Sequence, residues 1–253
     1  MIHREERESV TVLRMEHGRA NALDAELVTA LADELAAIER TDDTSAVVLT
    51  GIGSIFSAGV DLYRFLDSGE EYHDRFFAAL VRCFHQLFEF PKPLVAAVNG
   101  HAIAGGAVMV SAADYRIMAK GRGTVGVPEL RVGIPFPVVA IEILRFAAST
   151  RHLQQMVYLG RTYSAEDGLE VGLIDELVDP DSLLDRALEM ALEMGHTAPA
   201  RFRLTKRELR APALERVARH SPAADPEVLA GWKAPETHAA LRAYVERTLE
   251  RPR

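Results

Sequence analysis

The sequence predicts an α/β core followed by a helical C-terminal region. Short apolar runs of β character alternate with segments of helical spacing as far as Val178, whereas no strand candidate follows Pro180. The 253 residues are 48% hydrophobic and 26% charged, which is ordinary globular usage and allows a sizeable core. We place a boundary near Gly195, with the core over residues 1–195 and the helical region over residues 196–253.

The first half of the chain alternates between the two element types. Leu27, Leu31 and Leu35 fall at helical spacing, and Asp24 can cap the start of their helix. The run 94–98 is short, wholly apolar and of β type, as expected for a buried strand. We predict strands at 10–15, 46–50 and 94–98, and helices at 24–40, 76–88 and 102–113.

The second half continues the alternation and then becomes helical. Pro135 and Pro137 stand near the start of one helix, and Ser164 opens another with Asp167 as its capping-box partner. Small helices without a core of their own usually pack on something else, often another subunit. We predict strands at 115–118, 124–127 and 173–178, and helices from about 135 to 148, at 151–159, from 164, and at 181–195, 199–210 and 235–249.

Charge and residue types argue against several classes of function. The net charge of -8 disfavours nucleic acid as a partner, because phosphate binding needs clustered Lys and Arg. The single cysteine, Cys83, rules out an internal disulfide and a cysteine zinc site, and we interpret it as a buried hydrophobe. The nine histidines form no HExxH pair or close cluster, so we expect no metal site. The N-terminus lacks an apolar signal segment and no run reaches the ~18 apolar residues of a membrane span, so we expect a cytoplasmic protein.

The first stretch that suggests chemistry is FSAGVDL at residues 56–62. Gly59 permits a turn that other residues resist, and such a turn can aim a backbone N–H into a cleft. On these residues alone, an ordinary strand-to-helix loop is the better interpretation. Two other motifs fail here: a dinucleotide fingerprint would need glycine where Phe56 stands, and neither Ser54 nor Ser57 has the glycines of a nucleophile elbow.

The second stretch is KPLVAAVNGHAIAGG at residues 92–106. It predicts a buried strand, an Asn-Gly turn and then a helix opened by paired glycines. The first turn of a helix has unpaired N–H groups and the positive end of the helix dipole, and Gly105 would let a ligand oxygen come close. The arrangement suits an oxyanion, although glycine-rich helix starts also serve tight packing. His101 alone is more often structural than catalytic.

The third stretch is VPELRVGIP at residues 127–135. It places the carboxyl group of Glu129 among apolar residues. Burial would raise the pKa of this carboxyl group and make it a usable base. Taken in isolation, the same residue is better explained by an ion pair with Arg131 or by capping of a helix.

Taken together, these stretches resemble the crotonase family, also called the enoyl-CoA hydratase/isomerase family. The resemblance covers nearly the whole chain, with its pieces in the right order and at the right spacing. The matching pieces are 19–23 (RANAL), 56–62, 92–114 with Arg116 and Ile117, 128–133, 164–166, 168–169, 172–178 (GLIDELV), and Thr205 with Lys206. Each piece alone is weak, whereas the ordered set is highly specific.

The family likeness implies a spiral of ββα turns, a C-terminal helical trimerisation region, and a homotrimer or a dimer of trimers. It also implies an acyl-coenzyme A thioester as substrate, with coenzyme A bound as part of the substrate and no separate cofactor. In the family, two backbone N–H groups hold the thioester oxygen, and these fall at Val60 and Gly105. The coenzyme A-binding set that the likeness implies is Arg19, Ala20, Ala22, Ser57, Ala58, Gly59, Val60, Asp61, Leu62, Gly105 and Gly106.

The sequence departs from the hydratase pattern at one position. Hydratases of the family place two Glu residues around a water; the second is matched by Glu129, whereas the first would stand at Val108. Asp114 is too far along the chain to replace it. A single Glu is what the double-bond isomerases of the family use, so we favour an isomerase with Glu129 as its base. The alternatives are hydration, another lyase or hydrolase reaction, and a non-catalytic acyl-CoA-binding scaffold.

The acyl pocket is expected to be lined from 62–77 and from 136–143, where aromatic and apolar residues favour a greasy acyl group. This would suit an enzyme of fatty acid metabolism.

Overall fold

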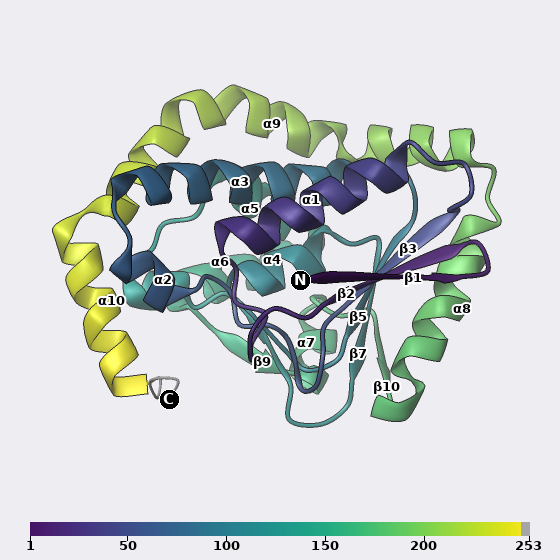
Figure 1. The fold of residues 1–253 in the computed structure, drawn as a ribbon, viewed down its shortest axis with the longest axis horizontal. Coiled ribbons are helices and arrows are strands. Elements are labelled where there is room, and N and C mark those ends of the chain that lie inside the picture. Colours follow the sequence, from purple (N-terminus) through teal and green to yellow (C-terminus); the bar gives the residue numbers. More distant parts are fainter. Residues whose placement is uncertain (249–253) are drawn as a thin grey trace.

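A computed structural model describes residues 1–248 of the chain (Figure 1). The predicted helical region 196–253 and the predicted helix 235–249 both reach past residue 248, so their last residues lie outside the described part.

Two sheets form the centre of the fold. The larger one has six strands in the order β1-β2-β3-β5-β7-β10, all parallel to their neighbours except β1, which is antiparallel to β2. The smaller one has four strands in the order β4-β6-β8-β9, and only β8 and β9 pair in antiparallel fashion. The strands are β1 (Ile2–Arg7), β2 (Val10–Met15), β3 (Ala46–Thr50), β4 (Ile55–Ser57), β5 (Leu94–Val98), β6 (His101–Ile103), β7 (Tyr115–Ala119), β8 (Thr124–Gly126), β9 (Thr162–Ser164) and β10 (Glu176–Val178).

The chain order confirms the predicted spiral of two strands and a helix. Strands β3, β5 and β7 join the larger sheet, and the strand that follows each of them, β4, β6 or β8, joins the smaller sheet before a helical segment begins. The helices are α1 (Ala25–Glu39), α2 (Leu62–Asp67), α3 (Glu70–Glu89), α4 (Gly105–Ala112), α5 (Val138–Ala147), α6 (Thr150–Leu159), α7 (Ala165–Glu170), α8 (Leu183–Gly195), α9 (Pro199–Lys233) and α10 (Pro235–Thr248), with 3-10 turns η1 (Glu129–Val132) and η2 (Pro180–Ser182).

The larger sheet is buried on both faces, because neighbouring residues of a strand point to opposite sides. Val10 and Val12 on β2 belong to a cluster with Ala187 and Ala191 of α8. Leu13, on the same strand, belongs instead to the main core that includes α1, α3 and α4. This explains why β3 and β5 are buried at every position and why β5 is wholly apolar, as the run 94–98 predicted.

The helix starts follow from local sequence. The side chain of Asp24 accepts a hydrogen bond from the backbone N–H of Leu27 at 2.8 Å, as the predicted cap of α1 requires. The hydroxyl of Ser164 accepts one from the N–H of Asp167 at 3.0 Å at the start of α7. Cys83 is fully buried on α3, and burial raises the pKa of its thiol to about 12, which confirms its interpretation as a core residue.

The C-terminal helices fold back over the core of their own chain. Helix α9 crosses above α3 and α5, and α10 turns down beside α2 (Figure 1). Ala213, Val217, Trp232 and Leu241 from these helices belong to the main core cluster. The predicted boundary at Gly195 therefore coincides with the end of α8, but the helices beyond it share the core of the preceding residues.

Four predicted elements differ from the structure. Residues 101–103 form strand β6, so the helix expected from Ala102 begins only at Gly105. The strand expected over 173–178 is limited to Glu176–Val178, because the N–H groups of Leu173 and Ile174 donate to the carbonyl of Gly168 instead. Helix α3 begins six residues before the predicted 76–88. Helix α9 continues far past Arg210, through three internal prolines. Strands β1, β4 and β9 and helix α2 were not predicted.

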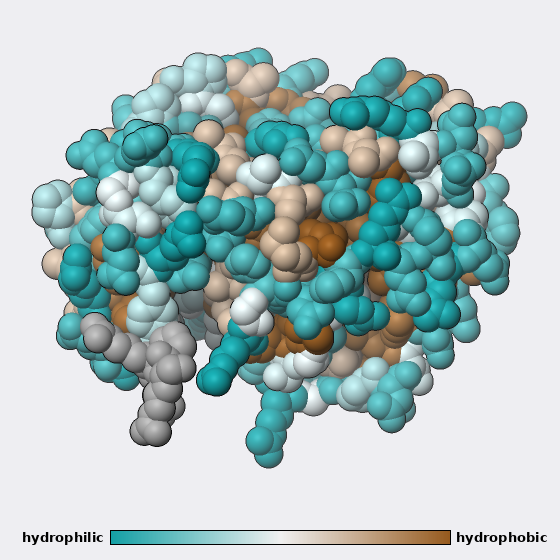
Figure 2. Space-filling model, in the orientation of Figure 1, coloured by the Kyte–Doolittle hydropathy of each residue, from teal (hydrophilic) through white to brown (hydrophobic). Residues whose placement is uncertain are grey.

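Within residues 1–248, no helix combines the length and apolarity needed to cross a bilayer. Nor do three or more His, Cys, Asp or Glu side chains of that part gather as a metal site. The face in Figure 2 is mostly hydrophilic, with smaller hydrophobic areas near its middle.

Candidate active site

Three predicted site segments leave the smaller sheet at the same edge. Strands β4, β6 and β8 are neighbours and run parallel. Beyond their carboxyl ends stand Val60, Gly105 and Glu129, each two to three residues after the last residue of its strand. Carboxyl ends of adjacent parallel strands are the usual place for a ligand in α/β folds. The sheet thus brings together three residues that are far apart in the sequence.

Gly59 lies directly against the start of α4. Its φ of +81° is in the left-handed region, and an added Cβ would come within 2.6 Å of the Ala104 Cβ and 3.4 Å of the Gly105 nitrogen. Only glycine avoids this collision, so the sequence of the turn sets the close approach of the two backbones. The loop carrying Val60 and the first turn of α4 are therefore one structural unit.

The backbone N–H groups of Val60 and Gly105 have no acceptor among the described residues. The neighbouring groups are used: Leu23 donates to the carbonyl of Gly59 at 2.7 Å, and Asp61 donates to the carbonyl of Leu23 at 2.9 Å. At Gly105 the helix dipole adds a partial positive charge. Two unpaired donors on adjoining backbone segments are suited to hold one anionic oxygen.

Ala104, at the start of α4, has an unusual backbone conformation. Its φ of +55° and ψ of -127° are disfavoured for a residue with a side chain. Strain of this kind concentrates at ligand sites, where it is held by the surrounding structure. The N–H of Ala104 donates to the carbonyl of Gly126 at 2.8 Å, which ties the strained residue to the end of β8.

Gly105 serves packing as well as access. An added Cβ there would lie 2.7 Å from the Leu23 Cδ1 and 3.6 Å from the Phe84 Cζ, both core side chains. Gly106 is equally constrained, because its added Cβ would meet the Ser57 carbonyl oxygen at 2.6 Å. The packing interpretation of the paired glycines is thus supported, and it is compatible with the free N–H of Gly105.

Glu129 begins the 3-10 turn η1 and is only 9% exposed. Its Oε2 has no hydrogen-bond partner. Burial raises the pKa of its carboxyl group from 4.5 to about 8, while a backbone hydrogen bond opposes part of that rise. Arg131 is exposed and makes no ion pair with Glu129 in the described structure, so the ion-pair interpretation is not supported.

The three other positions considered for acid–base chemistry, at Val108, Asp114 and His101, have contacts that suit a structural role. Val108 is 1% exposed on α4 and offers no polar atom. Asp114 accepts hydrogen bonds from Lys206 at 2.6 Å and from Arg210 at 2.7 Å, and its Oδ2 also accepts from the backbone N–H of Leu94. The Nδ1 of His101 lies 2.9 Å from the Thr124 hydroxyl.

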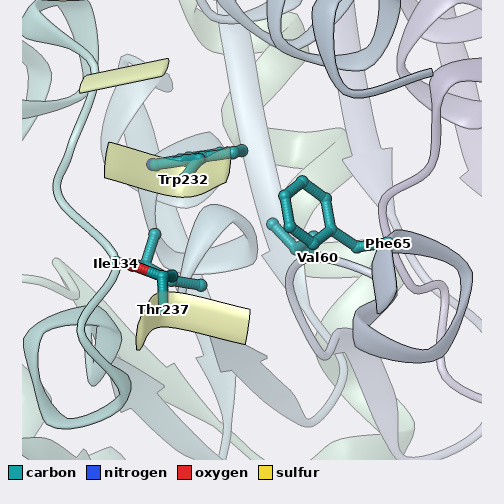
Figure 3. Close-up of a pocket in the computed structure, with 5 residues that line it drawn as sticks. All are labelled: Val60, Phe65, Ile134, Trp232 and Thr237. Carbon is teal, nitrogen blue, oxygen red and sulfur yellow. The ribbon is translucent and has the colours of Figure 1, made fainter. Parts of the chain in front are cut away.

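The apolar crevice beside Val60 is the cavity of this region (Figure 3). Trp232, Ile134 and Thr237 lie on one side of it, and Val60 and Phe65 lie on the other. Its walls leave no gap wide enough for a water molecule. The turn of Glu129 borders it, because the N–H of Ile134 donates to the Glu129 carbonyl at 3.0 Å.

Sequence reasoning found only part of this lining. Phe65 lies in the expected range 62–77, but no crevice residue comes from 136–143, and Ile134 stands just before that range. Trp232 and Thr237 come from α9 and α10, which were expected to serve assembly. The indole N–H of Trp232 donates to the Pro135 carbonyl at 2.7 Å and fixes the ring there. A lone tryptophan in a charged helical region was the one signal that could have pointed to it.

The segments predicted to bind the nucleotide lie side by side. The N–H of Ala58 donates to the Ala20 carbonyl at 3.0 Å, and the Ser57 hydroxyl donates to the Asn21 carbonyl at 2.8 Å. Asp61 caps α2, which starts at Leu62. The remaining members of the set, Arg19 and Ala22, are exposed and half-buried respectively. Their role in nucleotide binding stays a prediction.

Comparison with known proteins places these features in context. A family model described as Enoyl-CoA hydratase/isomerase matches residues 5–250 of the chain. A protein of Thermus thermophilus, provisionally named an enoyl-CoA hydratase, is 35% identical over 191 residues, which are 74% of this chain and 75% of that protein.

Solved structures share the fold but carry two different names. The apo enoyl-CoA isomerase of Mycobacterium tuberculosis has a TM-score of 0.81 at 30% identity, covering 89% of this chain and 98% of that one. The same mycobacterial protein is provisionally named a hydratase in another crystal structure, with a TM-score of 0.83. Human mitochondrial delta3-delta2-enoyl-CoA isomerase has a TM-score of 0.93 with 97% of each chain covered, and its 24% identity supports the fold alone. These names do not distinguish hydration from isomerisation.

Proposed function

Because this chain belongs to the enoyl-CoA hydratase/isomerase family, we propose that it shifts the double bond of an enoyl-CoA thioester, with Glu129 as the only acid–base group. One observation carries the proposal. Glu129 is buried with an unpartnered Oε2 at the same edge of the smaller sheet as Val60 and Gly105, whereas the position where a hydratase would hold its other Glu is the apolar Val108.

The reaction moves one proton between two carbons. The Glu129 carboxylate removes a proton from C2 of a 3-enoyl thioester, and the electron pair moves onto the thioester oxygen. The N–H groups of Val60 and Gly105 hold that oxyanion, and each fixed donor contributes roughly 3–4 kcal/mol. The Glu129 carboxyl group then returns the proton to C4, which leaves the double bond between C2 and C3. A pKa near 8 suits a group that must both take and give a proton.

Coenzyme A would bind along the contact between two segments. Residues 19–23 and 57–61 are joined by backbone hydrogen bonds that flank Val60. This arrangement supports a proposal in which the nucleotide lies near Arg19 and the pantetheine chain leads to the thioester between Val60 and Gly105. The apolar crevice would then take the acyl group once its walls separate, because it is too narrow for a chain as it stands.

The central experiment compares two reactions in two proteins. Wild-type protein should isomerise a 3-enoyl-CoA thioester faster than it hydrates the 2-enoyl form. Glu129→Gln keeps the shape of the side chain but cannot take a proton, so turnover should fall ~10²-fold or more. Binding of a saturated acyl-CoA, measured by calorimetry, should be retained.

Each other result has a distinct meaning. Fast hydration without isomerisation would overturn the choice of reaction and require another water-activating group. No turnover of either substrate, together with unchanged acyl-CoA binding in Glu129→Gln, would favour a non-catalytic acyl-CoA-binding scaffold. Equal turnover in Glu129→Gln and wild type would remove Glu129 from the mechanism.

A homotrimer or a dimer of trimers is also proposed, assembled through the helices after Gly195. One reason for this expectation has weakened, because α9 and α10 bury apolar side chains in the core of their own chain. The support that remains is the family likeness. Light scattering at micromolar concentration should give three or six times the 27.9 kDa of one chain, and a monomer would overturn the proposal.

A further inference from the structure

A second cavity lies where the first half of α9 meets the ends of α4, α5 and α8, and it shares no lining residue with the crevice. It has a volume of about 300 Å³, at the lower end of the ~300–1,000 Å³ range of small-molecule sites. We call it the α9 groove. The lining residues that the argument uses are Ser111, Asp114, Phe146, Lys206, Leu209 and Arg210.

The α9 groove carries an unbalanced positive charge. Lys206 and Arg210 share one carboxylate, Asp114, at 2.6 and 2.7 Å. Arg116, which also lines the groove, is neutralised by Asp175 at 2.7 Å. Three cations with two carboxylates leave one positive charge, in a chain whose net charge is -8. A local site of this sign would attract a single negative charge.

The two cations that share Asp114 are deeply buried, and each can still donate a further hydrogen bond. The side chains of Lys206 and Arg210 are only 7% and 4% exposed. Lys206 has three N–H bonds and uses two, toward Asp114 and the Lys92 carbonyl. Arg210 donates to Asp114 and to the carbonyls of Phe88 and Ala113, and its Nε–H has no partner among the described residues.

Ser111 supplies an independent sign of a polar ligand. It is 1% exposed, it lines the α9 groove, and its hydroxyl has no hydrogen-bond partner. An unmatched buried hydroxyl costs about 1–3 kcal/mol, so such groups normally have a partner. This hydroxyl is therefore free to donate to a ligand oxygen in the groove that it lines together with Lys206 and Arg210.

The outer part of the α9 groove is apolar. The side chains of Phe146 and Leu209 are 43% and 65% exposed, which is unusual for large hydrophobic residues. The guanidinium of Arg210 stacks near the Phe146 ring, with 5.5 Å to the ring centroid, so the cationic floor and the apolar wall adjoin. A ligand that matches both parts has an anionic head and a hydrocarbon chain.

We propose that the α9 groove binds a monocarboxylate with a hydrocarbon chain, of the kind of a free medium-chain fatty acid. The carboxylate would lie between Ser111, Lys206 and Arg210, and the chain would cover Phe146 and Leu209. A monocarboxylate matches the single excess charge. This site is separate from Glu129 and does not depend on the proposed reaction.

Decanoate binding to the full chain, measured by calorimetry, tests the proposal. Leu209→Asp places a repelling carboxylate at the rim of the α9 groove, and it should weaken decanoate binding at least about tenfold, or ~1.4 kcal/mol. Leu204→Asp is the matched control, because Leu204 is 51% exposed on the same helix but does not line the groove. Ser111→Ala should also weaken binding, and decanol should bind at least about tenfold more weakly than decanoate, because it lacks the charge.

Three outcomes would overturn the proposal. Equal decanoate affinity in Leu209→Asp and Leu204→Asp would place the ligand elsewhere, for example in the crevice at Trp232. Equal binding of decanol and decanoate would remove the role of the cations. A lower molecular mass for Leu209→Asp than for Leu204→Asp in light scattering would show that another copy of the chain covers the groove.

Discussion

Two carboxyl groups show how the same burial leads to opposite roles in this molecule. Glu129 and Asp114 are both largely removed from solvent. At the edge of the smaller sheet, Glu129 has an unpartnered oxygen, and burial raises its pKa to about 8. Where α9 meets the larger sheet, Asp114 accepts from Lys206, Arg210 and the backbone of Leu94. A buried charge without partners is costly and reactive, whereas a paired one fixes the elements that carry its partners.

Removal of Asp114 should produce the largest change in stability. Asp114→Ala would leave Lys206 and Arg210 buried without a carboxylate, and breaking a buried pair in this way costs about 3–5 kcal/mol. Urea unfolding should show this loss in the free energy of unfolding. Turnover per folded molecule should change far less than in Glu129→Gln.

Asp175→Ala is the matched control for that experiment. Asp175 also pairs with an arginine, Arg116, but its side chain is 28% exposed, so water can replace part of the interaction. The loss of stability should be clearly smaller than in Asp114→Ala. An equal loss in the two variants would show that the burial of Asp114 does not increase the cost of removing its carboxylate.

The edge of the smaller sheet should respond in catalysis before it responds in stability. In Gly59→Ala the new Cβ would push against Ala104 and the Ile103 carbonyl, and so displace Val60 from Gly105. If those two N–H groups act together, turnover should fall on the order of 10²-fold, the scale for one lost oxyanion donor. Steady-state kinetics on the 3-enoyl thioester measures this.

Gly53→Ala is the matched control, because it introduces backbone strain without displacing a neighbouring segment. Gly53 also has a positive φ, +61°, but nothing lies within 4 Å of its added Cβ. It should lose roughly 1 kcal/mol of stability and keep its turnover. A similar fall in turnover in both variants would contradict the assignment of Val60 and Gly105 as an oxyanion-binding pair.

The sequence indicated the long elements and the burial of Glu129 among apolar residues, because both depend on local signals. The spacing of Leu27, Leu31 and Leu35 identifies α1 without knowledge of its neighbours. Strand β6 could not be found this way. Its three residues, 101–103, are compatible with either a strand or a helix, and pairing with β4 and β8 decides the outcome. Propensity alone does not record such long-range pairing.

The crevice wall formed by the C-terminal helices could not be predicted for the same reason. Pro212 suggests the end of a helix, since an internal proline costs about 3 kcal/mol. Helix α9 nevertheless continues, because it packs on α3 and α5 and buries Ala213 and Val217 in the core. Only that continuation carries Trp232 to the crevice beside Val60, so this wall of the crevice depends on packing between distant segments.

The dependence of turnover on pH should follow the titration of Glu129. If Glu129 is the base, the free enzyme needs its carboxylate form, so kcat/KM for isomerisation should rise about tenfold per pH unit below about pH 8 and then level off. A flat profile across pH 6–8 would contradict a raised pKa for Glu129.

Stability should show the opposite trend over the same range. Between pH 4.5 and 8 the folded protein keeps a proton on Glu129 that the unfolded chain has lost. The unfolded state therefore binds fewer protons, and the free energy of unfolding should fall by about 1.4 kcal/mol per pH unit as pH rises. Below pH 4.5 both states are protonated, so Glu129 no longer makes the free energy of unfolding depend on pH. Urea unfolding of wild type and Glu129→Gln at pH 5 and pH 8 isolates this contribution. The free energy of unfolding of the variant, relative to that of the wild type, should be higher at pH 8 than at pH 5. A parallel pH dependence in the two proteins would assign the trend to other groups.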